Sequence, residues 1–215
     1  MIPDWLTERR DMVERQLRRR RIRDPRVLSA MLAIPREEFF PTENRVSAYR
    51  DEPAQIGYGQ TISQPYMTAL MAELLELSGT EKVLDVGSGS GYHAAVLGAL
   101  TARVISIELL PGLAALARQN LEKTGRAENI SVVCGDGSEG YPDESPYDAI
   151  SVAAGAPDIP SSLLEQLADP GQLVIPVGDF DDQELRVVTK SGGRITWRIA
   201  THCRFVPLRG HLGWR

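Results

Sequence analysis

Several features of common protein classes are missing from this sequence of 215 residues. It has only two cysteines, Cys134 and Cys203, so we expect no disulfide framework. No stretch approaches about 18 uncharged apolar residues, so no membrane-spanning helix is expected. The first ten residues, MIPDWLTERR, contain no apolar run of the kind found in signal peptides. These absences predict a reduced, cytoplasmic protein without a membrane partner.

An excess of positive charge is also missing. The formal net charge is −5 at pH 7, which does not favour a general nucleic-acid surface. Apolar residues make up 42% of the chain and charged residues 25%, an ordinary globular composition. We therefore expect one globular domain over residues 1–215, acting as a monomer without a nucleic-acid partner.

Common catalytic motifs are absent as well. The chain has no metal-ligand signature and no G-x-S-x-G, which is typical of serine hydrolases. It has no Tyr-x-x-x-Lys pair of the kind that short-chain oxidoreductases use. The three histidines, His93, His202 and His211, have no obvious acid partner in the sequence, so we interpret each as structural.

The N-terminal part is predicted to be helical. Residues 5–21 are loosely periodic, and residues 24–35 form a second helix, which Asp24 can cap and in which Pro25 suits the first turn. The basic run RRRRIR at residues 18–23 has two interpretations. It is either a phosphate-binding patch or a solvated helix end, where cations suit the helix dipole.

A long segment without regular periodicity follows at residues 41–65. It carries three prolines and two glycines, and long loops inside compact domains are more often functional than idle. Residues 66–77 then return to a helical pattern. Their apolar side chains recur at helical spacing and predict one buried face, made of Met67, Leu70, Met71, Leu74 and Leu75.

From residue 82 strands alternate with helices. We expect strands at 82–87, 103–108, 129–136, 147–155 and 171–178, and helices at 92–100, 110–125 and 160–168. Two further strands, 184–190 and 195–208, flank a glycine turn. The pattern predicts an α/β fold with a Rossmann-like, doubly wound, mostly parallel sheet, a C-terminal antiparallel hairpin and an N-terminal helical appendage. Within the single domain we place the appendage and active-site loop at 1–78, the cofactor-binding core at 79–178 and the hairpin and tail at 179–215.

Ligands of such sheets bind at the carboxyl ends of the strands. There the first strand runs into VGSGSGY at residues 86–92. This loop departs from the dinucleotide fingerprint G-x-G-x-x-G, because Gly87 and Gly89 fit but Tyr92 takes the third place. On the next strand, Glu108 follows Gly89 by about 20 residues, where a carboxylate accepts hydrogen bonds from ribose hydroxyls. A carboxylate there would repel a 2′-phosphate, which disfavours NADP.

Two more carboxylates lie beside the loop. Asp136 is placed to accept a hydrogen bond from an adenine amino group, although it could instead form a local Asx turn. Asp85 could support the loop, meet a cationic ligand or act as a local cap. Three carboxylates do not suit a pyrophosphate. They suit a ligand with ribose, adenine and a positive centre, which favours S-adenosylmethionine over NAD.

These residues resemble a known family. The run LDVGSGSGY at 84–92, Glu108 and GDG at 135–137 resemble class I methyltransferases. More narrowly, IGYGQTISQPYM at 56–67, residues 147–178 and RFVPLRG at 204–210 are similar to the protein-L-isoaspartate O-methyltransferases, over nearly the whole chain. The resemblance implies methyl transfer from S-adenosylmethionine, with S-adenosylhomocysteine as product, to the free α-carboxylate of L-isoaspartyl residues in damaged proteins and peptides. The ester then closes to a succinimide, which begins repair.

The resemblance also implies a set of site residues. It makes Ser63 the active-site serine, for which we expect an orienting role. The alternative is a serine that caps the helix beginning near Pro65. The residues expected at the cofactor are Thr61, Ile62, Tyr66, Asp85, Gly87, Ser88, Gly89, Glu108, Leu109, Asp136 and Gly137.

Three other functions stay open at this point. A class I methyltransferase could act on a small molecule or on another protein acid, since the fold does not fix the acceptor. An NAD-dependent short-chain oxidoreductase would want a third glycine near position 92. A non-catalytic module could bind an adenosine ligand without transferring a methyl group.

Overall fold

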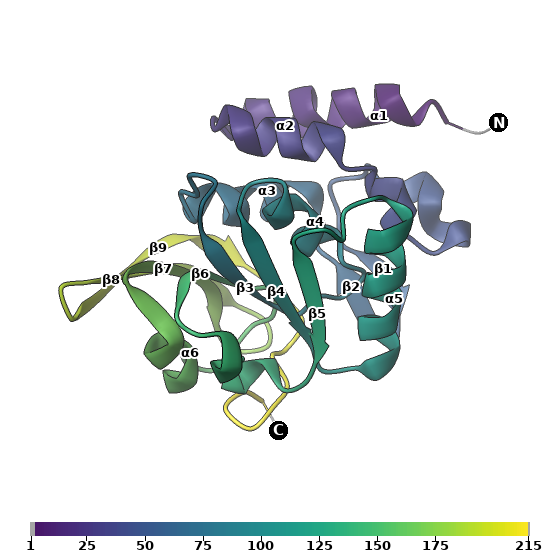
Figure 1. The fold of residues 1–215 in the computed structure, drawn as a ribbon. Coiled ribbons are helices and arrows are strands. Elements are labelled where there is room, and N and C mark those ends of the chain that lie inside the picture. Colours follow the sequence, from purple (N-terminus) through teal and green to yellow (C-terminus); the bar gives the residue numbers. More distant parts are fainter. Residues whose placement is uncertain (1–2, 215) are drawn as a thin grey trace.

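The computed structural model describes residues 3–214 and is built on a seven-stranded sheet in the order β5-β4-β3-β6-β7-β8-β9 (Figure 1). Pairing is parallel from β5 to β7, and β8 and β9 continue antiparallel. This confirms the predicted fold class. The strands are β3 (Lys82–Val86), β4 (Arg103–Glu108), β5 (Ile130–Cys134), β6 (Tyr147–Val152), β7 (Leu167–Gly178), β8 (Gln183–Ser191) and β9 (Arg194–Cys203).

Helices cover both faces of the sheet (Figure 1). Adjacent residues of β3 belong to different clusters: Val83 packs in the cluster that also contains residues of α3, α4 and α5, whereas Leu84 packs in the cluster that contains Leu163 of α6. Burial on both faces explains why the parallel strands read as continuous apolar runs. The helices are α3 (Pro65–Leu74), α4 (Tyr92–Gly98), α5 (Pro111–Lys123) and α6 (Ser161–Gln166).

The N-terminal helices form an outer layer that packs against α3 and α4 (Figure 1). Helix α1 (Trp5–Asp11) continues as irregular helical turns to Arg20, and α2 (Pro25–Ala33) follows. As predicted, Asp24 caps α2 by accepting a hydrogen bond from the backbone N–H of Arg26 at 2.7 Å. The apolar side chains of this layer join the same core as the sheet.

The segment predicted to lack regular structure contains more order than expected. Just before this segment a short 3-10 turn lies at Arg36–Phe39. Within it another lies at Thr42–Ser47, and a two-stranded hairpin pairs β1 (Ala54–Gly57) with β2 (Gln60–Ile62). Its turn residues, Tyr58 and Gly59, both have left-handed backbone. Strands this short show no alternation that a sequence pattern could reveal.

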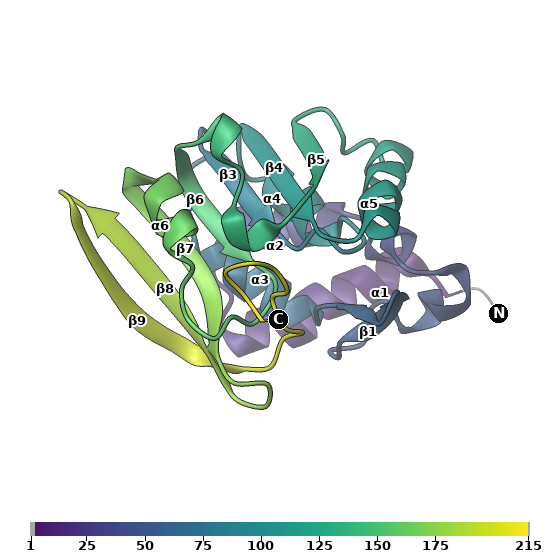
Figure 2. The same ribbon diagram turned by 90° about the horizontal axis from the view of Figure 1, so that it is seen from below.

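The C-terminal hairpin also ends earlier than predicted. Gly192 and Gly193 turn the chain with left-handed backbone between β8 and β9. Strand β9 stops at Cys203, not near residue 208, and the chain then leaves the sheet. Figure 2 shows residues 204–214 looping back beneath the carboxyl ends of the parallel strands.

Candidate active site

The glycine loop leaves β3 at the point where the strand order reverses, because β3 lies between β4 and β6. Gly87 donates its N–H to the Ile107 carbonyl at 2.8 Å and has a φ of 94°. At Gly89 φ is 52°, and a Cβ atom would lie 3.2 Å from Ile56 of the β1–β2 hairpin. Glycine therefore allows both the tight turn and the close approach of that hairpin.

Glu108 at the end of β4 holds this loop in place. Its two carboxylate oxygens accept hydrogen bonds from the backbone N–H groups of Gly89 at 2.9 Å and Leu110 at 3.0 Å. The residue is only 7% exposed, and the part that remains accessible lines a cavity. Because each carboxylate oxygen has two lone pairs, it can still accept hydrogen bonds from ligand hydroxyls.

The first cavity, of about 230 Å³, opens along these strand ends. Its walls combine the glycine loop and Glu108 with apolar side chains from β3, β4 and α5. Several residues predicted at the cofactor line it, namely Thr61, Gly87, Gly89, Glu108, Leu109 and Gly137. Sequence reasoning missed others, among them Tyr58 at the hairpin tip, Leu113 and Ala153.

Asp85 and Ser88 do not line the first cavity. Asp85 is fully buried, and it accepts a hydrogen bond from Ser106 Oγ at 2.6 Å. Ser106 in turn lies 2.5 Å from Ser88 Oγ in the glycine loop. Burial raises the pKa of Asp85, and nearby His93 and the Ser106 hydroxyl oppose that shift. Asp85 therefore supports the glycine loop through Ser106, and it does not meet a ligand in the first cavity.

Asp136 is also engaged within the protein. It accepts hydrogen bonds from the N–H and hydroxyl of Ser138, at 2.9 and 2.7 Å, and from the N–H of His211 at 2.7 Å. The Asx-type turn is therefore present, and the carboxylate does not line the first cavity. Burial alone would raise the pKa of Asp136, but these hydrogen bonds hold it below its ordinary value.

His211, which donates to Asp136, belongs to residues 206–214, which we call the C-terminal strap. The strap supplies a wall of the first cavity with Val206, Pro207, Leu208 and Arg209. It is fastened by Leu212 N–H to Ser138 Oγ at 3.0 Å and by Trp214 Nε1 to the Gly155 carbonyl at 3.0 Å. Only the resemblance of RFVPLRG pointed to this segment in the sequence, and no local periodicity marks it.

A second cavity, of about 350 Å³, lies beside the first. It is lined by Ser63 and Tyr66 on one side and by residues 201–206 on the other, and Thr61 and Ala153 border both cavities. Tyr66 was expected at the cofactor, but it belongs to this second cavity, where the Arg20 guanidinium lies 3.4 Å from its ring centroid. Ile62 is buried, and it borders a small space of about 40 Å³ between this loop and the glycine loop.

Ser63 does not cap α3. The N-cap position is Gln64, and within residues 3–214 the Ser63 hydroxyl makes no hydrogen bond. Its carbonyl oxygen accepts a hydrogen bond of 2.6 Å from Arg36 Nη2. Arg36 is fully buried and also donates to the Ala48 carbonyl at 2.7 Å. The backbone of the serine is thus fixed, and Ser63 lines both the second cavity and the small space next to the glycine loop.

The histidines have acid neighbours that the sequence did not reveal. His202 lies 3.1 Å from Asp182, His211 lies 3.5 Å from Glu139, and His93 lies 4.0 Å from Asp85. The first two pairs are exposed. Burial lowers the pKa of His93, and the charge of Asp85 opposes that shift. Among residues 3–214 no group of three His, Cys, Asp or Glu side chains is arranged to hold a metal ion.

Comparisons with known proteins identify a family. The family model for protein-L-isoaspartate(D-aspartate) O-methyltransferase matches residues 7–213. A protein-L-isoaspartate O-methyltransferase from Hyperthermus butylicus is 50% identical over 224 residues, covering 99% of this chain and 93% of that protein. One from Koribacter versatilis is 52% identical over 207 residues, covering 96% and 93%.

Solved structures agree with the sequences. A protein-L-isoaspartate O-methyltransferase structure has a TM-score of 0.83 at 30% identity, covering 95% of this chain and 67% of that one. A candidate protein-L-isoaspartate O-methyltransferase from Plasmodium falciparum, solved with S-adenosyl-L-homocysteine, has a TM-score of 0.80 at 29% identity and covers 94% and 98%. With a family match over almost its whole length and relatives at half identity, the chain belongs to the protein-L-isoaspartate(D-aspartate) O-methyltransferase family.

Proposed function

We propose that this chain transfers a methyl group from S-adenosylmethionine to the free α-carboxylate of L-isoaspartyl residues in damaged proteins and peptides. The ester can close to a succinimide and reopen as a normal aspartyl linkage, which amounts to repair. The observation that carries the proposal is the meeting of two cavities at Thr61 and Ala153, one marked by Glu108 and the other by Ser63. Membership of the family supports the same reaction.

The first cavity fits S-adenosylmethionine by its chemistry. Glu108 can accept hydrogen bonds from ribose hydroxyls, and Leu109 and Leu113 offer apolar surface to adenine. Gly87 and Gly89 line the same cavity, so their backbone is open to a ligand there. When bound, S-adenosylmethionine supplies a methyl group on a positively charged sulfur. Asp85 and Ser88 act beneath the loop in this proposal, and Asp136 acts by holding the strap.

The acceptor needs little chemical activation from the protein. A carboxylate has a pKa near about 4, so at pH 7 it is already the nucleophile and no general base is required. We assign Ser63 an orienting role, in which its hydroxyl donates a hydrogen bond to the acceptor carboxylate. Arg36 fixes the Ser63 backbone, so the donor is held before the substrate arrives. Such alignment can lower a barrier by several kcal/mol, up to about 7–11 in the best cases.

The same geometry bears on the choice between isomers. Isoaspartyl and aspartyl residues carry the same groups, and only the carbon through which the chain continues differs. Charge cannot separate them, so the shape and the hydrogen-bond directions of the second cavity have to. We therefore expect an isoaspartyl peptide to react far faster than its aspartyl twin.

A tritium-transfer assay with paired isoaspartyl and aspartyl peptides tests the proposal. The product should be a base-labile ester on the isoaspartyl peptide. Ser63→Ala should lower kcat while calorimetry shows a smaller change in cofactor binding, because an orienting bond acts on the reacting geometry. Ser191→Ala, an exposed serine at the end of β8, serves as control. Equal reaction of both peptides would overturn the assignment.

Calorimetry also separates the ligand classes. S-adenosylmethionine and its demethylated product should bind, and NAD should not, because the loop lacks the third glycine of the dinucleotide fingerprint. Tight binding of NAD alone would point to an oxidoreductase. Binding of S-adenosylmethionine without methyl transfer to any isoaspartyl peptide would leave a binding module.

We further propose that the chain works as a cytoplasmic monomer without a nucleic-acid or membrane partner. In support, side chains of a single copy line both cavities. The net charge of −5 disfavours polyanions. Separately, none of the helices formed by residues 3–214 is both long and apolar enough to cross a bilayer. Light scattering at assay concentration checks the monomer.

A further inference from the structure

The ionisable side chains that line the second cavity are all cationic or neutral. Arg20 enters from the N-terminal layer, and His202 and Arg204 enter from the end of β9. No aspartate or glutamate among residues 3–214 lines this cavity, although the chain as a whole is acidic. The acids that pair with these groups, Asp51, Asp182 and Asp181, lie outside the lining.

Arg20 is held more firmly than an ordinary surface arginine. One face of its guanidinium lies on the ring of Tyr66, and Nη1 pairs with Asp51. Within residues 3–214 its Nε and Nη2 groups make no hydrogen bond. The side chain is still 42% exposed. A planar guanidinium fixed by stacking and by one ion pair can present its remaining N–H groups to an incoming carboxylate.

The surrounding sequence explains why only this arginine of the basic run reaches the cavity. Arg18 pairs with Glu14 one helical turn earlier, and Arg21 has left-handed backbone, with φ of 71°, that ends the helix. The five arginines of residues 18–23 therefore do not converge on one phosphate. The run is mostly a solvated helix end, and Arg20 is the exception.

From these contacts we infer that the second cavity selects isoaspartyl sites that carry another carboxylate close by in the peptide. Arg20 binds that second carboxylate, and Arg204 strengthens the field from the opposite wall. The inference rests on the proposed function, because it places the isoaspartyl group at Ser63 in the same cavity. The second carboxylate can come from an acidic side chain or from a free C-terminus.

Matched peptides distinguish these sources. One isoaspartyl peptide is made with Glu, Gln or Lys next to the isoaspartyl residue, on either side, and each version has a free or an amidated C-terminus. The measurements are KM and kcat, together with peptide binding by fluorescence anisotropy in the presence of S-adenosylhomocysteine. Binding reports on recognition without any methyl transfer.

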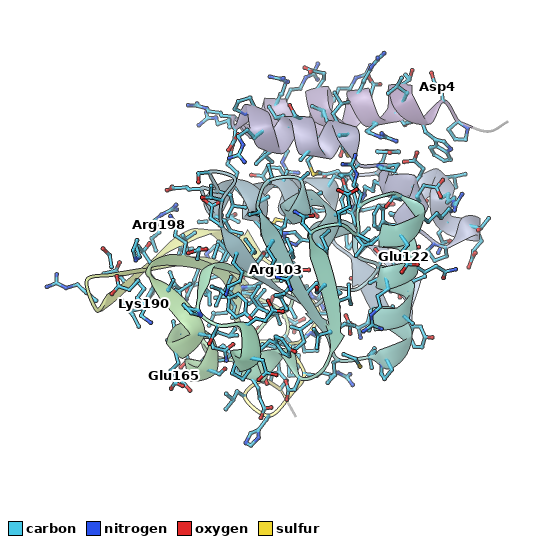
Figure 3. All side chains as sticks on the ribbon, in the orientation of Figure 1. Asp4, Arg103, Glu122, Glu165, Lys190 and Arg198 are labelled. Carbon is cyan, nitrogen blue, oxygen red and sulfur yellow. The ribbon has the colours of Figure 1, made fainter. Side chains whose placement is uncertain are left out.

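The Glu peptide should bind about 3- to 10-fold more tightly than its Gln twin at low salt, with KM changed and kcat nearly constant. The preference should shrink in 0.5 M NaCl, since Arg20 is partly exposed. Arg20→Gln should remove it, and Arg20→Lys should retain part of it. Arg198→Gln removes an equal charge from an exposed position on β9 (Figure 3) and should leave the preference intact.

Several outcomes would overturn the inference. They are equal binding of the Glu and Gln peptides together with equal binding of the free and amidated C-termini, a preference that survives Arg20→Gln, or a preference for Lys. A preference for the free C-terminus over the amide, with no effect of Glu, would assign Arg20 to chain ends instead of side chains. If no isoaspartyl peptide is methylated at all, the proposed function itself fails, which is a different result from methylation without preference.

Discussion

Glu108 links the glycine loop to the cofactor cavity through one carboxylate. Both of its oxygens accept backbone N–H groups, so it shapes the loop as well as the wall that a ribose would touch. We expect Glu108→Ala to weaken binding of S-adenosylhomocysteine by about 1–3 kcal/mol, the range for losing a buried hydrogen-bond partner. Calorimetry measures this. Glu122→Ala on the exposed side of α5 (Figure 3) is the control, and equal affinities would refute the role.

His93 gives a pH dependence that can be measured at the scale of one residue. Burial lowers its pKa below the ordinary value of 6.5 in the folded protein, against the opposing charge of Asp85. As the pH falls below 6.5 the unfolded chain takes up a proton that the folded protein resists. The contribution of His93 to the free energy of unfolding is therefore fully present above pH 6.5. It is lost as the pH falls toward the pKa of His93 in the folded protein.

The variant His93→Gln should reduce that slope. Urea unfolding at constant ionic strength between pH 7.5 and 5.5 should show a smaller loss of stability for His93→Gln than for the wild type. An unaltered slope in His93→Gln would mean that the folded protein protonates His93 as readily as the unfolded chain does.

At the scale of elements, the buried side chain of Arg36 holds the loop that carries Ser63. Arg36 reaches the Ser63 carbonyl from the turn after α2, and its guanidinium lies 4.6 Å from the ring centroid of Tyr92, which follows the glycine loop. One buried cation thereby connects the N-terminal layer with the loops that border both cavities. Burial lowers the pKa of Arg36, although the nearby Tyr92, Tyr49 and Asp51 oppose that shift.

Arg36→Met should lower kcat and also destabilise the fold by about 1–3 kcal/mol for each carbonyl left unpaired. Arg26→Met is a matched control, since Arg26 also donates to two carbonyls, those of Leu77 and Leu100, and none of these three residues lines either cavity. The control should lose stability but keep kcat once folded. If both variants keep kcat, Arg36 is only a structural clamp.

The C-terminal strap provides the second element-scale prediction. Gly210 has a φ of 149°, and a Cβ atom there would overlap the Asp136 carboxylate and the Ser138 hydroxyl. Gly210→Ala should therefore lift the strap and weaken cofactor binding. Gly193→Ala, also at positive φ but with open space around it, should cost comparable backbone strain, of order 1–3 kcal/mol, without changing cofactor affinity. Calorimetric titration of both variants decides the point.

The elements that the sequence predicted well are those with a strong local pattern. The parallel strands are continuous apolar runs bounded by turns, and α2 has a clear cap at Asp24. The β1–β2 hairpin is too short for a pattern. The strap is irregular and depends on N–H groups that meet Asp136 and Ser138 about 75 residues earlier in the chain, which no local signal reveals.

The site residues also divide into those that a local sequence pattern located and those that it did not. Gly87, Gly89 and Glu108 lie where the loop and strand pattern places them, because strand ends converge in any sheet of this type. The family resemblance placed Tyr66 at the cofactor together with Thr61, as part of the same loop. The direction of its side chain depends on the turn into α3 and on stacking with Arg20, a contact between segments far apart in the sequence.

The whole molecule is organised around a core that crosses every proposed boundary. We keep the proposal of one domain over residues 1–215, with segments 1–78, 79–178 and 179–215. One buried cluster contains Met31 from the first segment, Val104 from the second and Val187 from the third. Tyr92 adds a direct connection, since its ring packs edge-on against Phe39 with centroids 5.5 Å apart.

Because side chains of the N-terminal layer and of the sheet belong to one apolar cluster, unfolding either part would expose part of that cluster to water. We therefore expect a single calorimetric transition, with calorimetric and van't Hoff enthalpies equal. S-adenosylhomocysteine at 100 times its Kd should raise the free energy of unfolding of that single transition by about 2.7 kcal/mol. A variant without residues 1–34 should fail to give a cooperative transition, since the surface beneath α1 and α2 would then face solvent. Two resolved transitions, of which the ligand shifts only one, would show instead that the N-terminal layer is a separate folding unit resting on an independent cofactor-binding core.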